Sequence, residues 1–140
     1  MENPASVVVQ RRIDWSDTDA SGHYHNATVW RLVEAAEALL HDRLGIRTQT
    51  FGRTPRVRTT AEHRAPLYFY DLVDVQLTVA AVGRASLTYR FEVRRGDLVA
   101  ASGDLVCVLV DRGGGSSTPW PDDWRAALQQ AGPQPPERIA

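Results

Sequence analysis

ATVWRLVEAAEALLHDRL, residues 27–44, is the stretch that decides the fold. Its apolar side chains recur at helical spacing and would line one face of a helix; they are Val29, Leu32, Val33, Ala36, Leu40 and Leu44. Asn26 or Thr28 is placed to cap the helix start, and Gly45 follows where a left-handed residue ends many helices. The segment predicts one long helix with a single core-facing side.

Strands are predicted on both sides of this helix. Residues 7–13, VVVQRRI, form a β-branched run before it. After it, apolar and polar residues alternate in three runs, which are residues 57–64, 73–81 and 87–93. Residues 98–110 form the last strand, and its end, LVCVLV, predicts cover on both faces, in the sheet centre or at a subunit contact. Turns are expected at residues 82–84 and 95–97.

The order strand, helix, four strands indicates a single α+β domain spanning residues 1–140. A sheet must bury its apolar face, and one helix is available to cover it, so an antiparallel sheet wrapped around that helix is the simplest packing. We expect the core in residues 7–111. Residues 112–140 should add a flexible loop, a short helix capped by Asp122 and a frayed tail. Apolar residues remaining on the other sheet face predict a dimer or larger assembly.

Composition excludes several classes of protein. The formal net charge of −1 provides no basic field for nucleic acid or for an anionic membrane. No apolar run approaches the ~20 residues that span a bilayer, and the first residues do not resemble a signal peptide. Cys107 is the only cysteine and is expected to be a buried apolar residue in a reducing, cytoplasmic compartment.

Polar chemistry concentrates in DTDASGHYHN, residues 17–26, directly before the helix. The first amides of a helix have no intrahelical acceptors, and the helix dipole adds roughly half a positive charge there. A developing oxyanion would be stabilised at this point, and a carboxylate a few residues upstream is placed to act on the carbonyl carbon. The loop therefore suggests acyl transfer to water.

The segment from Arg12 to Ala36, RIDWSDTDASGHYHNATVWRLVEAA, resembles the first signature of the 4-hydroxybenzoyl-CoA thioesterase family of the hotdog superfamily. That signature is a strand, then D-x-D-x-x-G, a short loop, and a helix with an acidic residue followed by Ala. The variant GHYHNA is similar to the GHVNNA form of acyl-CoA and acyl-carrier-protein thioesterases, and EHRAPLYFYD resembles the segment before the family's third strand. The resemblance covers about residues 7–111 and implies a hotdog fold.

The resemblance also implies a role for each residue of the loop. Asp19 is the catalytic carboxylate, acting as nucleophile or as general base on water, and the backbone N–H near Asn26 holds the thioester oxygen. His23 lies beside the active site and orients water or polarises the carbonyl. Four further residues are expected to contact the substrate or shape its site: Asp17, Ser21, Gly22 and Arg84, the last by reaching the nucleotide phosphate of coenzyme A. Asp17 also has a loop-stabilising interpretation, since its carboxylate can accept local backbone amides.

Three alternatives remain open at this stage. Glu34 or Glu37 would supply the base in another hotdog branch, but with Asp19 present we interpret both as side-wall or interface residues. A hotdog hydratase or dehydratase would carry D-x-N-P-x-H, which is missing here. The chain could also be a non-catalytic module that binds acyl thioesters. His23 and His25 lack further ligands for zinc, so we expect no metal.

The implied function is hydrolysis of an acyl thioester to a free acid. The substrate would be a small-molecule acyl-CoA or an acyl carrier protein, and coenzyme A or phosphopantetheine enters only as part of it, so no separate cofactor is expected. The resemblance further implies self-association into a homodimer and beyond it a homotetramer. Neither nucleic acid nor membrane is expected as a partner.

Overall fold

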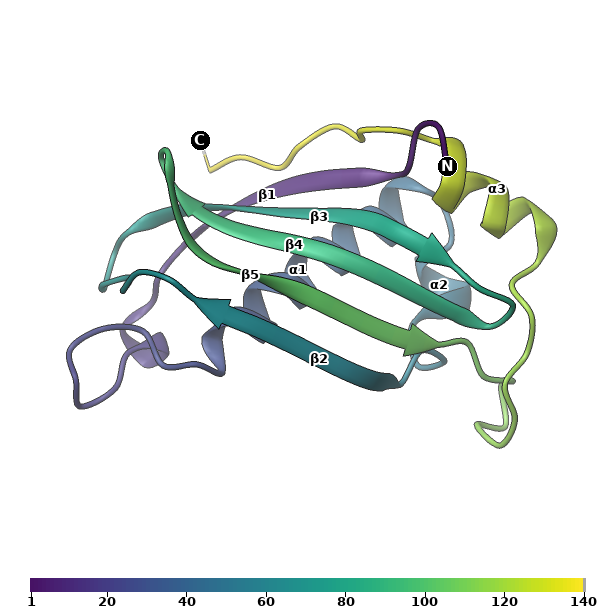
Figure 1. Ribbon diagram of the computed structural model, residues 1–140, viewed down its shortest axis with the longest axis horizontal. Helices are drawn as coiled ribbons and strands as arrows, with labels where there is room; N and C mark the ends of the chain where they lie inside the picture. The colour runs from purple at the N-terminus through teal and green to yellow at the C-terminus, as the bar shows by residue number, and fades with distance from the viewer. Residues whose placement is uncertain (140) are drawn as a thin grey trace.

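The computed structural model describes residues 1–139 and consists of one antiparallel sheet with a long helix on one face (Figure 1). The strands are β1 (Ser6–Arg12), β2 (Arg56–His63), β3 (Leu72–Val82), β4 (Ser86–Arg95) and β5 (Leu98–Val108). Their order in the sheet is β1-β3-β4-β5-β2, and every neighbouring pair is antiparallel. The expected strand, helix and four-strand order is confirmed.

The core lies between the sheet and helix α1 (Thr28–Arg43). The apolar stripe predicted for this helix is buried from Val29 to Leu40, with Leu44 half-buried beyond its end. On β3, β4 and β5 the inward members of the alternating strands are buried, whereas those of β2 are not; examples of the buried ones are Val75, Leu77, Tyr89, Phe91 and Leu105. Burial of each large side chain contributes about 2 kcal/mol, which explains why the period-two pattern fixes the register of the sheet.

The ends of α1 differ from the sequence prediction in one respect. Gly45 has a φ of 75°, as a residue following a helix C-cap should. Neither Asn26 nor Thr28 caps the start, because Ala27 holds the cap position and Thr28 is already helical. The Thr28 hydroxyl instead donates to the carbonyl of Asp17, 3.0 Å away, and so ties the preceding loop to the helix.

Two expectations about the outer sheet face are not met within one protomer and stay predictions about its assembly. The face away from α1 is hollowed into a shallow cavity of about 650 Å³ whose central lining is polar, including Gln76, Arg90 and Glu92. In β5 and the residue pair after it, Leu105, Cys107 and Leu109 are buried, but Val106, Val108 and Val110 are only half-buried. The outward faces of β3 and β4 carry more charged side chains than apolar ones.

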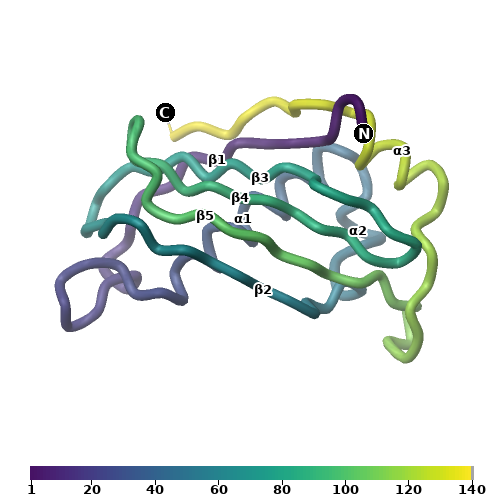
Figure 2. Tube along the Cα trace, viewed as in Figure 1, coloured from purple at the N-terminus to yellow at the C-terminus, as the bar shows by residue number. Residues whose placement is uncertain are grey.

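The C-terminal region packs more closely than a frayed tail. Helix α3 (Asp122–Gln130) begins at Asp122, so this residue lies in the first turn and Pro121 is the cap. Residues 133–139 then run beside β1 (Figures 1 and 2), with the N–H of Gln10 donating to the carbonyl of Glu137 at 2.8 Å. The tail therefore covers one edge of the sheet.

The other edge is open. Strand β2 pairs with β5 alone, and most of its residues are exposed, including Val57 at 60%. An unpaired edge strand presents free N–H and C=O groups along its length. Short helix α2 (Arg47–Thr50) precedes β2 and packs on the C-terminal end of α1. Within residues 1–139, no helix has the length and apolarity required to span a membrane.

Candidate active site

The polar loop joins β1 to α1 at one end of the sheet, where it folds back on itself. A short 3₁₀ helix, η1 (Trp15–Asp17), is followed by a tight hairpin in which Thr18 pairs with Tyr24. The N–H of Gly22 donates to the carbonyl of Asp19 at 3.0 Å, and Gly22 has a φ of 89°, a conformation that disfavours other residues. This turn sets Asp19 on the outside of the loop.

Asp17 anchors the loop. Its buried carboxylate accepts two hydrogen bonds from Arg31, from Nε at 2.9 Å and from Nη2 at 2.5 Å, and a third from the N–H of Asp14 at 2.7 Å. Its carbonyl accepts from the N–H of His25 at 2.9 Å. With its carboxylate occupied in this way, the arrangement favours the loop-stabilising interpretation of Asp17 over direct contact with substrate.

Asp19 is exposed, and its carboxylate is held by Ser21. Oδ1 accepts hydrogen bonds from the Ser21 hydroxyl and from the Ser21 N–H, the latter at 2.8 Å. These two bonds hold the pKa of Asp19 below its ordinary value of 3.8, and the nearby His23 and His25 act in the same direction. Asp19 is therefore ionised at neutral pH. Within residues 1–139 no hydrogen bond to its Oδ2 is found, so that oxygen is available to another molecule.

The two histidines of the loop, His23 and His25, follow this turn. His23 is half-buried, with Nδ1 3.3 Å from the carbonyl of Tyr24 and its ring edge-on to Tyr68. Tyr24 is buried, and its hydroxyl lies 3.0 Å from Nδ1 of His63 on β2. The N–H of Asp19 donates to the His23 carbonyl at 3.1 Å, and the contact between Tyr24 and His63 ties the loop to β2.

The start of α1 offers free donors. Thr28 N–H donates to the carbonyl of His25, but in the described part of the chain the backbone N–H groups of Asn26 and Ala27 have no acceptor. Asn26 is exposed and its side chain makes no hydrogen bond within residues 1–139. Unpaired amides at a helix N-terminus are suited to bind a carbonyl oxygen that gains negative charge.

Arg84 does not join these residues within one protomer. It lies in the turn between β3 and β4, at the opposite end of the sheet from the loop (Figure 1), where its Nη1 is 3.4 Å from the Ser117 hydroxyl. The structure thus brings Asp17, Asp19, Ser21 and His23 into one loop and leaves Arg84 apart.

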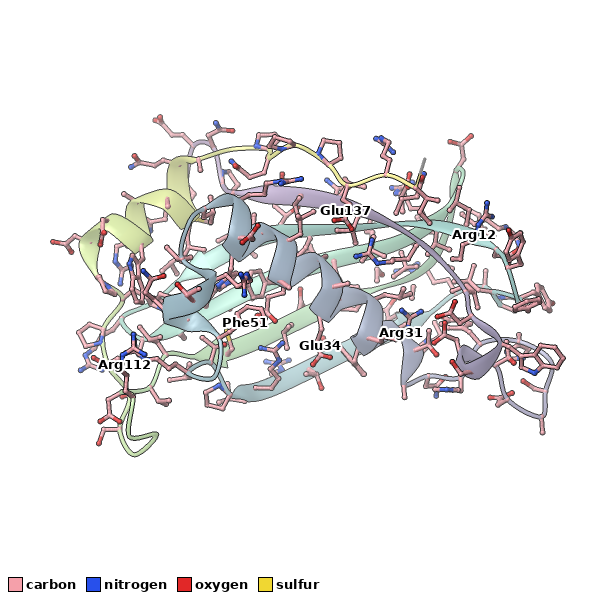
Figure 3. The ribbon with its side chains drawn as sticks, turned by 180° about the vertical axis from the view of Figure 1, so that it is seen from behind. Arg12, Arg31, Glu34, Phe51, Arg112 and Glu137 are labelled. Carbon is pink, nitrogen blue, oxygen red and sulfur yellow. The ribbon has the colours of Figure 1, made fainter. Side chains whose placement is uncertain are left out.

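The helix carboxylates also lie outside the loop. Glu37 is buried and forms a bidentate ion pair with Arg56, while Glu34 is exposed with its Oε2 3.9 Å from the same guanidinium. Both line a groove of about 600 Å³ between α1 and the start of β2, and Figure 3 shows Glu34 on that side of the helix. Burial raises the pKa of Glu37 in spite of Arg56.

A second buried polar cluster, His41, Thr50 and Tyr89, lies beside the Glu37–Arg56 pair. The Thr50 hydroxyl donates to the Ile46 carbonyl at 3.0 Å, so its oxygen accepts from Nδ1 of His41 at 2.6 Å. Nε2 of His41 is then the acceptor for the Tyr89 hydroxyl at 2.5 Å. This network requires a neutral imidazole, and burial lowers the pKa of His41 to about 4.

Sequence reasoning missed several of these partners. Arg31 was recognisable only as a polar helix residue, and nothing in its spacing points to Asp17, fourteen positions earlier. The aromatic run at residues 68–70 was only a weak sign of a surface site. Apolar residues between a proline and an aspartate are also typical of a buried strand. Within residues 1–139 no group of three or more His, Cys, Asp or Glu side chains is suited to hold a metal ion.

Comparison with known families agrees with this geometry. Residues 13–128 match the sequence model of the thioesterase-like superfamily. No curated protein gives a significant sequence match.

Solved structures share the fold over most of the chain. A predicted thioesterase from Bacillus stearothermophilus is 27% identical, with a TM-score of 0.82 over 93% of this chain and 98% of its own. A thioesterase from Thermus thermophilus, solved in complex with coenzyme A and Zn, is 26% identical, with a TM-score of 0.80 over 91% and 94%. A gentisyl-coenzyme A thioesterase, at 24% identity and a TM-score of 0.76 over 86% and 98%, shows the fold alone. The hotdog architecture is confirmed.

Proposed function

The chain belongs to the thioesterase-like superfamily, and from this premise we propose that it hydrolyses the thioester bond of an acyl-CoA with Asp19 as the reacting carboxylate. The observation that carries the proposal is the exposed, ionised Asp19, held by Ser21 on the loop that also presents the free amides of the helix start. The coenzyme A bound to the Thermus thermophilus thioesterase supports this class of substrate.

The reaction consumes one water. The N–H groups of Asn26 and Ala27 hold the thioester oxygen and stabilise the negative charge that develops as the carbonyl carbon is attacked. Asp19 either takes a proton from the attacking water or attacks directly to form an anhydride that water then opens. The thiol leaves as a thiolate of moderate pKa, so it needs little protonation by the protein. In both routes the products are a free acid and a thiol.

Ser21 and His23 assist this carboxylate. Ser21 fixes Oδ1 and leaves Oδ2 of Asp19 to act on water or on carbon. We assign to the half-buried imidazole of His23, whose charge lowers the pKa of Asp19, the role of orienting the water or the carbonyl. The lowered pKa makes the Asp19 carboxylate a weak base. It also keeps this carboxylate charged at neutral pH, as its proposed role requires.

We further propose that the working unit is a homodimer joined through β2. The β1 edge is covered by the tail, whereas β2 is open, so antiparallel pairing of two β2 strands would extend the sheet. A two-fold axis through β2 would bring the partner subunit's Arg84 to the end of the sheet that holds Asp19. It would also add walls to a loop that is open to solvent in one protomer. Pairing of two such dimers into a tetramer is a further expectation.

The activity is tested by following free-thiol release over a panel of aryl, short-chain and long-chain acyl-CoAs. Asp19→Asn should lower kcat/KM at least about 10²-fold, whereas Asp97→Asn, an exposed aspartate in the β4–β5 turn, serves as the matched control. Undiminished turnover in Asp19→Asn would refute the role of Asp19. If no acyl-CoA reacts, acyl carrier protein thioesters are the next substrates, and binding without turnover of either would favour the non-catalytic module.

The dimer is tested by sedimentation velocity. Val57→Lys places a charge on the exposed β2 edge and should convert a dimer to a monomer, with loss of turnover if the site needs both subunits. A wild-type protein that sediments as a monomer would refute the proposal.

A further inference from the structure

Four aromatic side chains form an exposed patch next to the candidate active site. Trp15, Tyr68, Phe69 and Tyr70 are 78%, 47%, 54% and 63% exposed, and we call them the aromatic patch. Phe69 joins the group, with its ring centroid 5.7 Å from that of Trp15 and 5.8 Å from that of Tyr70. Tyr68 reaches the active-site loop through its contact with His23. Large aromatic rings gathered at the surface contribute little to a core and mark sites of recognition.

The backbone beneath the patch is held in an unfavourable conformation. Tyr70 has a φ of 74°, the only positive value among the non-glycine residues described. Its N–H donates to the Ile13 carbonyl at 2.8 Å, while Asp71 closes the turn by accepting from the Tyr68 N–H at 2.8 Å. A glycine would take this position without strain, whereas Tyr70 takes it with a phenol ring that is exposed at the surface.

Arg12 adds a positive charge to the patch. Its guanidinium lies over the Tyr70 ring, 4.4 Å from the centroid, and Nη1 donates to the Tyr70 carbonyl at 3.1 Å. Within residues 1–139 no carboxylate lies within 4.0 Å of it, whereas the nearby Asp71 is paired with Arg95 at 3.1 Å. Figure 3 shows Arg12 and Arg31 at the same end of the molecule. The charge of Arg12 is therefore available to an anion.

Flat aromatic faces together with a guanidinium that has no carboxylate partner are suited to a nucleotide, because bases stack on aromatic rings and arginine binds phosphate. Coenzyme A carries an adenine and phosphates at the far end of the arm that ends in the thioester. We propose that the aromatic patch binds the adenosine phosphate end of coenzyme A, with the base stacked on Trp15, Phe69 or Tyr70 and a phosphate on Arg12. This inference rests on the proposed hydrolysis of acyl-CoA and gives that site its nucleotide-binding part.

One member of the patch, Tyr70, is anchored beside β1. Tyr70 is hydrogen-bonded to the residue that follows β1, which is separated from β2 by three strands of the sheet. The patch places the nucleotide on residues of one protomer, and a contact with Arg84 stays a separate prediction.

The first test is direct binding of adenosine 3′,5′-bisphosphate by calorimetry, which needs no turnover. The wild-type protein should bind it, and Trp15→Ala and Tyr70→Gly should each weaken binding about tenfold. Tyr70→Gly removes the left-handed strain, so its melting temperature should stay level or rise, and weaker binding cannot then be ascribed to unfolding. Leu98→Ala, an exposed apolar residue outside the patch, is the control.

The second test compares an acyl-CoA with the same acyl group on pantetheine, which lacks the nucleotide. The ratio of the two kcat/KM values should fall about tenfold in both patch variants and not in the control. A wild-type protein that does not bind the bisphosphate, or a ratio unchanged in both variants, overturns the patch and leaves the thioesterase standing. Bisphosphate binding that needs the patch, in a protein that hydrolyses no acyl-CoA, supports the patch and overturns the proposed hydrolysis.

Discussion

Arg31 in the first turn of α1 holds the carboxylate of Asp17 with two hydrogen bonds, and this ion pair ties the active-site loop to the helix that follows it. Because Asp17 is buried and its carbonyl also accepts from His25 and Thr28, the path of the chain on both sides of Asp19 depends on this one residue. The position of the exposed Asp19 is thus set by a neighbour two residues away.

Asp17→Asn should weaken the fold and the activity together. The amide keeps the size of the carboxylate but loses the charge-assisted bonds to Arg31, at a cost of about 1–2 kcal/mol after allowance for the half-exposed guanidinium. Thermal unfolding and thiol release measure the two effects. Asp14→Asn is the control, since its exposed carboxylate lies 4.0 Å from the same arginine. A loss of turnover above 10²-fold at unchanged stability would instead give Asp17 a direct role in catalysis.

Ser21→Ala should shift the acidic limb of the pH–rate profile to higher pH. Ser21 holds the pKa of Asp19 down, and the activity requires the ionised carboxylate, so it is lost as the pH falls through that pKa. Removing the hydroxyl raises the pKa and the limb moves upward. The measurement is kcat/KM against pH for both proteins, with the exposed Ser16→Ala as the matched change. A limb that does not move would mean that Asp19 is not the group whose ionisation limits the rate.

The long helix, the strands, both hairpin turns and the polar loop before the helix were predictable, because each has a local signature. Helical spacing from Val29 to Leu40 and strict alternation in residues 73–81 leave one way to bury the apolar side chains. The D-x-D-x-x-G loop is identified by its resemblance to a family signature, which lies within ten positions. These features need no knowledge of which segments meet in space.

What was missed depends on contacts between distant residues. The tail beside β1 and the pairing of His41 with Tyr89 join positions far apart in the sequence. A Pro-rich ending typically indicates disorder, and here backbone hydrogen bonds to an edge strand outweigh that tendency. The left-handed Tyr70 has no sequence signal, since tyrosine is a residue that usually avoids this conformation.

His41→Gln should make stability less sensitive to acid. The pKa of His41 is about 4 in the folded protein and 6.5 when unfolded, so the unfolded chain binds a proton first as the pH falls. Stability is therefore fully present above pH 6.5 and decreases by about 3 kcal/mol between pH 6.5 and 4. Urea unfolding across this range should show the decrease in the wild type and a smaller one in the variant. Above pH 6.5 the two curves should run parallel, and equal slopes below it would refute the neutral buried imidazole.

Glu37→Gln should cost stability but little activity. The change leaves the half-buried Arg56 without its carboxylate partner, which we expect to destabilise the fold by about 2 kcal/mol. Since Glu37 is already committed to Arg56, turnover measured well below the melting temperature should stay within a few-fold of wild type. Arg56→Gln breaks the same pair from the other side and should give a similar loss of stability. A 10²-fold loss of kcat in Glu37→Gln alone would move the catalytic base from Asp19 to the helix.

Ending the chain at Gly132 should uncover the β1 edge and cause self-association. The deleted tail accepts from Gln10, donates to the Val8 carbonyl and places Glu137 2.5 Å from Arg11, so its loss frees a row of backbone groups. Sedimentation velocity should show larger species whose amount rises with concentration. Glu137→Gln removes only the ion pair and keeps the backbone pairing, so it should sediment as the full chain does. Val57→Lys blocks the β2 edge and is therefore combined with the truncation. If the double variant still associates, the contact must run through β1. If the double variant is a monomer, the tail does not protect the β1 edge.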